Sequence, residues 1–340
     1  MVDPVPNPLG ARRRWLPWLR ACVAVALLAA LFTTVPWRDR AVLDADGATH
    51  LEPGLASSLR ALEPGAFALA CLLALGGTVT ASLRWTILLR ALGLAVSPWR
   101  ALRLNLAGLA ASQVLLGSVG GDVVKGALVT RDVGVPRDLD SRAGAVLAIV
   151  ADRVVGLAAL LTLGTGAMLA VGGELGRFAR FFGAGLAALL GAVLIALVVA
   201  ARMERSGGGT GAFARLLGAL HETLRAYAAK PGALFAASLL SFASHSFLIV
   251  GVAALGRSLG LGVDTLRFFL TIPVVETAQA VPVSPAGWGV AEGMYVMLLG
   301  EQGVTQAMAL SLAIAVRGVT LSQALLGVPG LLALLRPRAA

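Results

Sequence analysis

The sequence is poor in charged residues, cysteine and histidine. Charged residues make up 14% of the 340 residues, against about 25% in an ordinary soluble domain. The two cysteines, Cys22 and Cys71, both lie inside apolar runs, which excludes a disulfide framework and a Cys-x-x-Cys metal site. The three histidines are scattered, without a His-x-His or His-Glu-x-x-His pair. We therefore predict no metal and no cofactor.

Apolar side chains are abundant instead. Hydrophobic residues make up 58% of the chain, more than one or two soluble cores can hide in a protein of this length. The net charge of +10 could indicate nucleic-acid binding, but aromatic residues are only 6% and the basic residues lie in short segments between apolar runs. That distribution is typical of membrane topology. The sequence predicts an all-α polytopic membrane protein that has the lipid bilayer as a partner and no nucleic-acid partner.

Six apolar runs are long enough to cross a membrane, which takes about 20 mostly apolar residues per helix. They occupy residues 16–35, 66–83, 143–171, 181–201, 232–255 and 306–335. Two further runs, 104–119 and 268–283, are shorter and lead into Gly- and Pro-rich sequence. Irregular backbone at membrane depth is tolerated only where it is buried in protein or lines a wet cavity. We therefore predict about six full spans and two re-entrant or broken segments.

The basic residues between the spans indicate the orientation. With the N-terminus cytoplasmic, nineteen Lys and Arg lie on the cytoplasmic side and seven on the other, as the positive-inside rule requires. We predict a multi-pass protein of the cytoplasmic (inner) membrane with both termini cytoplasmic. Three arginines at 12–14 precede the first run, which lacks a small-residue cleavage site. We expect that run to be a retained anchor.

The chain divides into four parts of one transmembrane domain. We expect an N-terminal anchor and external loop over 1–65, a first repeat over 66–201, a cytoplasmic linker over 202–231 and a second repeat over 232–340. Apolar side chains on one face of 212–229 predict an amphipathic helix on the membrane surface within the linker.

The two halves resemble each other. In each, a span is followed by a broken segment with closely spaced glycines and then by a long helix that carries Arg153 or Arg317. The first broken segment opens to the cytoplasm and the second to the outside, which predicts an inverted repeat of the kind found in many transporters. The alternative is that a Gly- and Ala-rich chain produces this similarity between its halves by chance.

Three charged residues fall deep inside the predicted spans: Asp152, Arg153 and Arg317. Each costs about 2.5–3.5 kcal/mol at a bilayer centre. Asp152 and Arg317 lie on small-residue faces that pack inward. Two arginines with few buried acids suit an anionic group, and phosphate is the natural partner of a guanidinium. One hypothesis is therefore substrate binding by these three residues. The alternative is an ion pair that only locks helices together, or side chains that snorkel toward the membrane interface. By position Arg317 aligns with Arg153, but by helical face it aligns with Asp152.

Acidic residues flank the two broken segments. Glu276 and Glu292 flank the second, and Asp122 with Lys125 lies at the end of the first. These groups could bind a cation or a proton coupled to transport, and Glu276, in the middle of an apolar run, is our candidate for coupling. Asp122 and Glu292 could instead cap the helices that follow them.

Several of these motifs together resemble one known family. They are Arg84-Trp85, the Gly120-Gly121-Asp122 turn with Lys125, Arg131 and Gly134, the run Asp152-Arg153-Val154-Val155-Gly156-Leu157, the run Pro282-Val283-Ser284-Pro285-Ala286-Gly287-Trp288-Gly289-Val290-Ala291-Glu292, and Arg317. They are similar to the flippase-like transmembrane region of lysylphosphatidylglycerol synthases, of the multiple peptide resistance factor type. The resemblance covers roughly residues 65–335, with Asp152 where some relatives carry Glu, and Val281-Pro282-Val283 in place of the more usual Leu-Pro.

The resemblance implies lipid translocation by two inverted repeats and a stand-alone member without the aminoacyltransferase domain. The motif residues it assigns to the re-entrant segments are Gly120, Gly121, Asp122, Lys125, Pro285, Gly287, Gly289 and Glu292.

Three functions stay open. The first is flipping or scrambling of an anionic phospholipid, or of a lipid-linked, glycosylated or hopanoid-type lipid. The second is a membrane-embedded enzyme that uses Asp122, Glu276 or Glu292 on a lipid head group. No paired carboxylates, metal cluster or nucleophile with a base stands out in the sequence, so we predict no catalytic residue and no enzyme. The third is a scaffold whose partner is a lipid-modifying enzyme.

Overall fold

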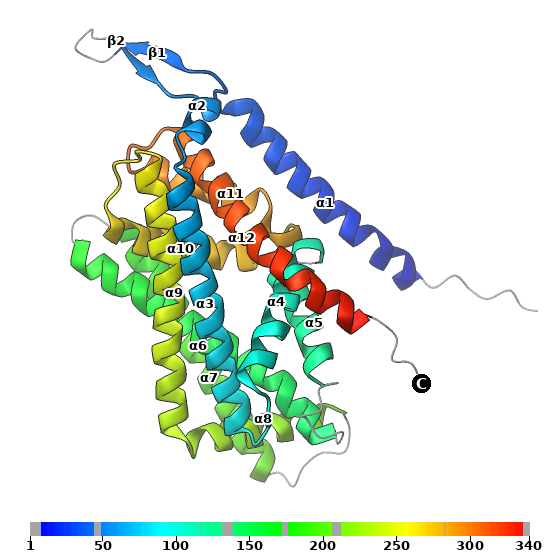
Figure 1. The fold of residues 1–340 in the computed structure, drawn as a ribbon. Coiled ribbons are helices and arrows are strands. Elements are labelled where there is room, and N and C mark those ends of the chain that lie inside the picture. Colours follow the sequence, from blue (N-terminus) through cyan, green and yellow to red (C-terminus); the bar gives the residue numbers. More distant parts are fainter. Residues whose placement is uncertain are drawn as a thin grey trace, which may run out of the picture.

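Helices form almost all of the structure. The computed structural model describes residues 8–43, 49–115, 117–130, 139–171, 176–205, 212–281 and 283–335. Apart from one two-stranded hairpin, the ordered elements in these ranges are helices (Figure 1). The predicted all-α class is confirmed.

The N-terminal part is a long helix followed by a small hairpin. Helix α1 (Pro8–Thr34) leads to strands β1 (Arg40–Leu43) and β2 (Thr49–Glu52), which pair antiparallel, and then to α2 (Leu55–Arg60). The carboxylate of Asp39 ties the base of the hairpin to α2, because it accepts from the Gly54 N–H at 2.8 Å and from the Ser57 hydroxyl. The predicted loop between the first two spans therefore contains ordered structure that the sequence did not indicate.

Two long antiparallel helices form the centre of the bundle, α3 (Pro64–Ala91) and α9 (Pro231–Ser258). At one end the Glu63 N–H donates to Ser258 Oγ at 2.8 Å. At the other, Lys230 Nζ donates to the carbonyl of Ala91 at 2.7 Å. Helix α3 therefore begins where α9 ends, side by side along their lengths (Figure 1).

Each predicted broken segment is a hairpin of short helices. The first consists of α4 (Pro98–Val114) and α5 (Gly117–Val129), and the second of α10 (Thr265–Ala280), the 3-10 turn η1 (Pro285–Gly287) and α11 (Val290–Gly300). Helix α4 starts just after α3 ends and α10 just after α9 ends, so the two hairpins enter the bundle from opposite ends. Both hairpins are longer than the predicted segments 104–119 and 268–283. The reason is that the helices begin earlier than predicted. Ser97 caps α4 and Asp264 caps α10, because each side chain accepts from a backbone N–H of the first turn.

One long helix of each half packs on the hairpin of the other half. Helix α12 (Gln306–Leu335) of the second half packs on α4 of the first, and α6 (Leu139–Val171) of the first half packs on α10 of the second. The contact of α12 with α4 is close: a Cβ on Gly327 would lie 2.0 Å from the carbonyl oxygen of Leu106. Each half therefore packs one long helix on the hairpin of the other half, and the inverted repeat itself stays a prediction.

Two more helices connect the halves, α7 (Gly176–Arg205) and α8 (Ala212–Ala228). Helix α8 lies at the end of the bundle where α3 ends (Figure 1), and its buried Tyr227 donates to the carbonyl of Leu88 at 3.3 Å. The predicted helix 212–229 agrees with α8. The apolar residues of its first turns lie outside those whose side chains the structure describes.

Among the described residues, four helices are long and apolar enough to cross a membrane: Pro64–Ala91, Ser141–Val171, Pro231–Ser258 and Gln306–Leu332. The described parts of α1 and α7 appear as shorter apolar helices, Leu19–Thr34 and Arg180–Ala192. The membrane class is therefore confirmed, and full crossing by α1 and α7 stays a prediction.

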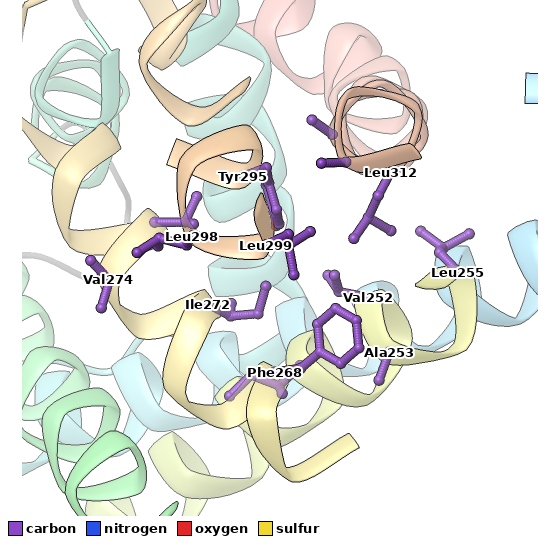
Figure 2. Packing of buried hydrophobic residues seen from close by; sticks show 14 of the residues in the cluster. Val252, Ala253, Leu255, Phe268, Ile272, Val274, Tyr295, Leu298, Leu299 and Leu312 are labelled. Carbon is purple, nitrogen blue, oxygen red and sulfur yellow. The ribbon is translucent and has the colours of Figure 1, made fainter. Parts of the chain in front are cut away.

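An apolar core holds the second hairpin between α9 and α12 (Figure 2). Phe268 and Ile272 of α10 meet Val252 of α9, Leu299 of α11 and Leu312 of α12, all buried. Because lipid tails are as apolar as these side chains, close van der Waals packing holds these helices together. This packing fixes α10 and α11 against α12, next to the polar groups described below.

Candidate functional site

A polar cavity lies inside the bundle, where the two hairpins approach each other. Its volume is about 420 Å³, and its wall includes residues of α3 to α6 and of α9 to α12. The polar residues of the wall are Thr78, Arg84, Asn105, Ser112, Gln113, Asp122, Lys125, Asp152, Arg153, Ser244, His245, Glu276, Gln279, Glu292, Tyr295, Arg317, Thr320 and Gln323. Asp152, Arg153 and Arg317, the three predicted substrate-binding residues, therefore line one cavity, but each belongs to a different ion pair.

Arg317 of α12 is hydrogen-bonded to the second hairpin. Its Nε and Nη2 donate to Oε1 of Glu292 at 2.9 and 2.7 Å, and Nη1 donates to the carbonyl of Ala286 at 2.9 Å. The guanidinium carbon lies 4.5 Å from the centroid of the Trp288 ring. The side chains of Arg317 and Glu292 are only 9% and 4% exposed. The other Glu292 oxygen accepts from the Gly289 N–H at 2.7 Å, so Glu292 both caps α11, as one alternative predicted, and holds Arg317.

The backbone around this pair explains the Pro285-Ala286-Gly287-Trp288-Gly289 sequence. Pro285 begins η1, and three of the next four residues have positive φ: Ala286 at 50°, Gly287 at 69° and Gly289 at 81°. A Cβ on Gly289 would lie 2.5 Å from Cβ of Leu27 in α1. Left-handed backbone costs a residue other than glycine about 1–2 kcal/mol, and the bond from Arg317 to the Ala286 carbonyl helps to offset that cost.

Arg153 of α6 makes the matching pair in the first half, with Asp122 of α5. Its Nε and Nη2 donate to the two carboxylate oxygens at 2.7 and 2.9 Å. The side chains of Arg153 and Asp122 are 55% and 26% exposed, in contrast to the buried pair in the second half. By ion pair Arg317 corresponds to Arg153, whereas by burial it corresponds to Asp152, since the side chains of Arg317 and Asp152 are both less than a tenth exposed.

Asp152 faces a third, buried cluster. It accepts from Nε of Arg84 at 2.8 Å and lies 3.7 Å from Nζ of Lys125, and these three side chains are each less than a tenth exposed. Arg84 also donates to the hydroxyl of Ser241 at 3.1 Å. Asp152 is therefore paired with residues of α3 and α5, and among the described residues no ion pair joins it to its neighbour Arg153.

Sequence reasoning missed Arg84 as a site residue. The predicted span 66–83 stops one residue short of it, whereas α3 runs to Ala91 and buries it. The apolar residues Ile87, Leu88 and Leu89 that follow Arg84 could have extended the span. His245 was missed as well. It lines the cavity, and its Nε2 lies 3.0 Å from the carbonyl oxygen of Gly156, to which it donates.

The Gly120-Gly121-Asp122 motif is not a turn. Helix α5 begins at Gly117, so all three residues are helical and Asp122 cannot cap it. The glycines allow close packing instead: a Cβ on Gly121 would lie 2.5 Å from the Gly108 carbonyl oxygen, and one on Gly120 would lie 2.5 Å from Cβ of Leu115. Arg131, Gly134 and Pro282 of the quoted motifs lie outside the described residues.

Glu276 of α10 differs from the other acids of the cavity. Gln279 donates to its Oε1 at 2.6 Å, and within the described ranges it has no basic group at ion-pair distance. It lies close enough to Arg317 and Arg153 to interact with both charges. The described residues contain no cluster of His, Cys, Asp and Glu that could hold a metal ion.

The model of the protein family described as "Lysylphosphatidylglycerol synthase TM region" matches residues 53–327 of the chain. This range contains both hairpins and every residue of the three ion-paired groups. No curated protein shows a significant match to the chain, and no solved structure does. The family match covers far more than half of the chain and agrees with the resemblance drawn from the motifs. The protein belongs to the family of the lysylphosphatidylglycerol synthase transmembrane region.

Proposed function

We propose that the protein translocates a lipid across the cytoplasmic membrane, as a flippase or scramblase. The observation that carries this proposal is the polar cavity between two hairpins that enter an apolar bundle from opposite ends. Charged groups at membrane depth are costly and serve function by default. A cavity of about 420 Å³ suits a lipid head group, while the acyl chains stay in the bilayer.

Arg153 is the group we assign to first contact with the lipid phosphate. Its side chain is 55% exposed while it holds Asp122, so a phosphate can reach it and compete with the carboxylate. A guanidinium binds phosphate bidentately, as it binds Asp122 here. Arg317 is already engaged by Glu292, Ala286 and Trp288, and we reassign it from the lipid to holding the second hairpin.

The two matched pairs suggest how the lipid moves. The Arg153–Asp122 pair is open and the Arg317–Glu292 pair is closed. Inverted repeats alternate by moving one half against the other. In a second state the closed pair opens and the open pair closes, and the head group leaves through the second half.

The basic loops favour an orientation with α4 and α5 entering from the cytoplasm. In that orientation both termini are cytoplasmic, because α1 runs toward the external hairpin β1–β2 and α12 runs back (Figure 1). The open pair then belongs to the hairpin that enters from the cytoplasm, the side on which newly made lipids start.

The enzyme alternative lacks a suitable acid pair. Asp122 and Glu292 each hold an arginine. Among the described acids of the cavity Glu276 alone makes no ion pair and has Gln279 as its hydrogen-bond partner, so no second free acid stands beside it. General acid–base catalysis needs a group free to exchange a proton with the substrate. The remaining role, as a scaffold for a lipid-modifying enzyme, predicts no lipid movement by the purified protein.

Reconstitution distinguishes these functions. The full chain is placed in liposomes with fluorescent phosphatidylglycerol, and lipid redistribution is measured by dithionite quenching while mass spectrometry follows lipid composition. We expect redistribution without a new lipid species, and a loss of at least tenfold in rate for Arg153→Gln. The control Arg257→Gln changes an arginine that bonds Thr265 outside the cavity, and it should leave the rate unchanged. A chemically altered lipid, or no redistribution, would reject the proposal.

A further inference from the structure

Lys125 lies in the cavity wall without a full set of partners. An ammonium group has three N–H donors. The nearest carboxylate oxygen, Oδ2 of Asp152, is 3.7 Å from Nζ, which is too long for a hydrogen bond. The other contact is the face of Trp85, whose ring centroid lies 3.7 Å from Nζ. Within the described part of the chain this buried ammonium has no hydrogen-bond acceptor, although its side chain lines the cavity.

The charges around Lys125 do not cancel. The groups that act on it are Asp152, Asp122, Arg153 and Arg84. Together with Lys125 they make three cations against two carboxylates. Over the whole cavity wall four acids face four basic residues, but the fourth acid, Glu276, acts on Arg317 and Arg153 and forms no ion pair with Lys125 among the described residues. Both carboxylates already have an arginine at 2.7–2.8 Å, so the surplus positive charge belongs to Lys125. A buried surplus charge is strongly unfavourable unless an opposite charge or hydrogen bonds compensate it.

The surroundings hold the ammonium in position. Lys125 is on α5, and the ring of Trp85 on α3 supports it from one side by a cation–π contact. Asp152 on α6 attracts it from another side, while the bond from Arg84 Nε keeps that carboxylate in place. Three helices therefore orient a lysine whose N–H donors are unused, next to a cavity with room for a head group.

We propose that Lys125 is the binding site for a phosphate group, an anionic oxygen ligand that supplies both the missing negative charge and the missing acceptors. The site lies on the same helix as Asp122, about one turn away, so a phosphate met by Arg153 can also reach Lys125 along the cavity wall. This inference deepens the proposed function and rests on it for the lipid as the source of the phosphate. A free phosphate ion has the same chemistry.

Binding to the full chain in detergent tests the site without requiring transport. Isothermal titration calorimetry compares dioctanoyl-phosphatidylglycerol, a dioctanoyl glucosyl glycerolipid without phosphate, and inorganic phosphate. For phosphatidylglycerol we expect Lys125→Met to weaken binding at least tenfold and Lys125→Arg to retain it within about threefold. Affinity for the glucosyl lipid should not change. The matched control Lys230→Met changes a lysine that caps α3 at Ala91, outside the cavity.

The outcomes separate the claims. If Lys125→Met keeps a wild-type unfolding midpoint and also binds phosphatidylglycerol with wild-type affinity, the site is wrong. If Lys125→Met does not fold, two other measurements decide: the affinity of Lys125→Arg for phosphatidylglycerol, and competition between inorganic phosphate and phosphatidylglycerol for the wild-type protein. If inorganic phosphate does not compete, the site is rejected. Binding of inorganic phosphate without the lipid supports the anion site and assigns it to a free ion. Lysine-dependent lipid binding in a protein that moves no lipid supports the site and rejects translocation.

Discussion

At the scale of single residues, buried charge in this protein is organised in small groups that differ in exposure. Arg317 uses Nε, Nη1 and Nη2 for three hydrogen bonds within the second hairpin, whereas Arg153 makes its two bonds at an open surface. The same guanidinium–carboxylate chemistry therefore has different consequences at the two sites. Removing one partner of a buried pair leaves the other charge uncompensated, and removing one partner of an exposed pair does not.

We predict that Arg317→Gln lowers the free energy of unfolding by about 3–5 kcal/mol, while Arg153→Gln lowers it by about 1 kcal/mol or less. Thermal unfolding of the detergent-solubilised variants measures the difference. The double variant Arg317→Gln with Glu292→Gln should lose less stability than Arg317→Gln alone, because no carboxylate is left unpaired. Equal losses for Arg317→Gln and Arg153→Gln would contradict the assignment of roles.

The site could be predicted in part. The position of charges inside apolar runs identified Asp152, Arg153 and Arg317, because the cost of charge in lipid makes such residues rare. Pairing could not be predicted, since the partners Asp122 and Glu292 lie on hairpins whose approach depends on tertiary packing. Arg84 was missed because a composition window ends a span at the first charge, whereas a charge near a helix end can be buried when another helix supplies a carboxylate.

At the scale of elements, close approach between helices decides where glycine is required. Helices α4 and α5 pack with the Gly121 position directly against the Gly108 carbonyl, so a side chain there has no room. Elsewhere on α5, Gly126 faces only ordinary contacts, the nearest at 3.5 Å from Cδ1 of Ile149. The fold of the hairpin was predictable as a broken segment, but the location of its turn was not, because glycine serves packing here rather than a turn.

We predict opposite effects of the same substitution at these two positions. Gly126→Ala should be neutral or stabilise the protein by up to about 1 kcal/mol, since alanine favours helix over glycine by that amount. Gly121→Ala should destabilise it by about 1–3 kcal/mol, because overpacking forces the helices apart. The unfolding midpoints of the two variants check this. A stabilised Gly121→Ala would show that α4 and α5 are less close than described.

The β1–β2 hairpin should respond to acid. The Ser57 hydroxyl and the Gly54 N–H donate to the Asp39 carboxylate and lower its pKa below the ordinary 3.8. A group with a lowered pKa in the folded state stabilises it above the ordinary pKa, and the contribution is lost as pH falls through the lowered value. We predict that hydrogen exchange at the Gly54 amide accelerates below about pH 3.8, after the measured rate is corrected for the intrinsic exchange rate at each pH. Asp39→Asn should abolish this pH dependence, and an unchanged profile would exclude Asp39 as its cause.

At the scale of the whole molecule, the contacts between α12 and α4 connect the two halves. A Cβ on Gly330 would lie 3.8 Å from Cβ of Ala107, within the 3.5–4.5 Å that a disulfide requires. Movement of one half against the other must change this distance.

We predict that an Ala107→Cys, Gly330→Cys pair, in a chain with Cys22 and Cys71 replaced by alanine, stops lipid redistribution when oxidised. Reduction should restore the rate, and each single cysteine variant should work in either condition. The measurement is the liposome assay with and without a reducing agent. An oxidised, fully cross-linked protein that still moves lipid would rule out relative motion of the halves at this contact.

The unequal exposure of two chemically similar ion pairs has an energetic consequence. If the change of state buries Arg153 and Asp122 while it exposes Arg317 and Glu292 to water, the first pair loses hydration and the second pair gains it. The two free-energy changes then offset each other. The two conformations are then close in free energy, so both are populated without an external source of energy. We therefore expect lipid to equilibrate between the leaflets without nucleotide hydrolysis, with its direction set only by where the lipid is made and consumed.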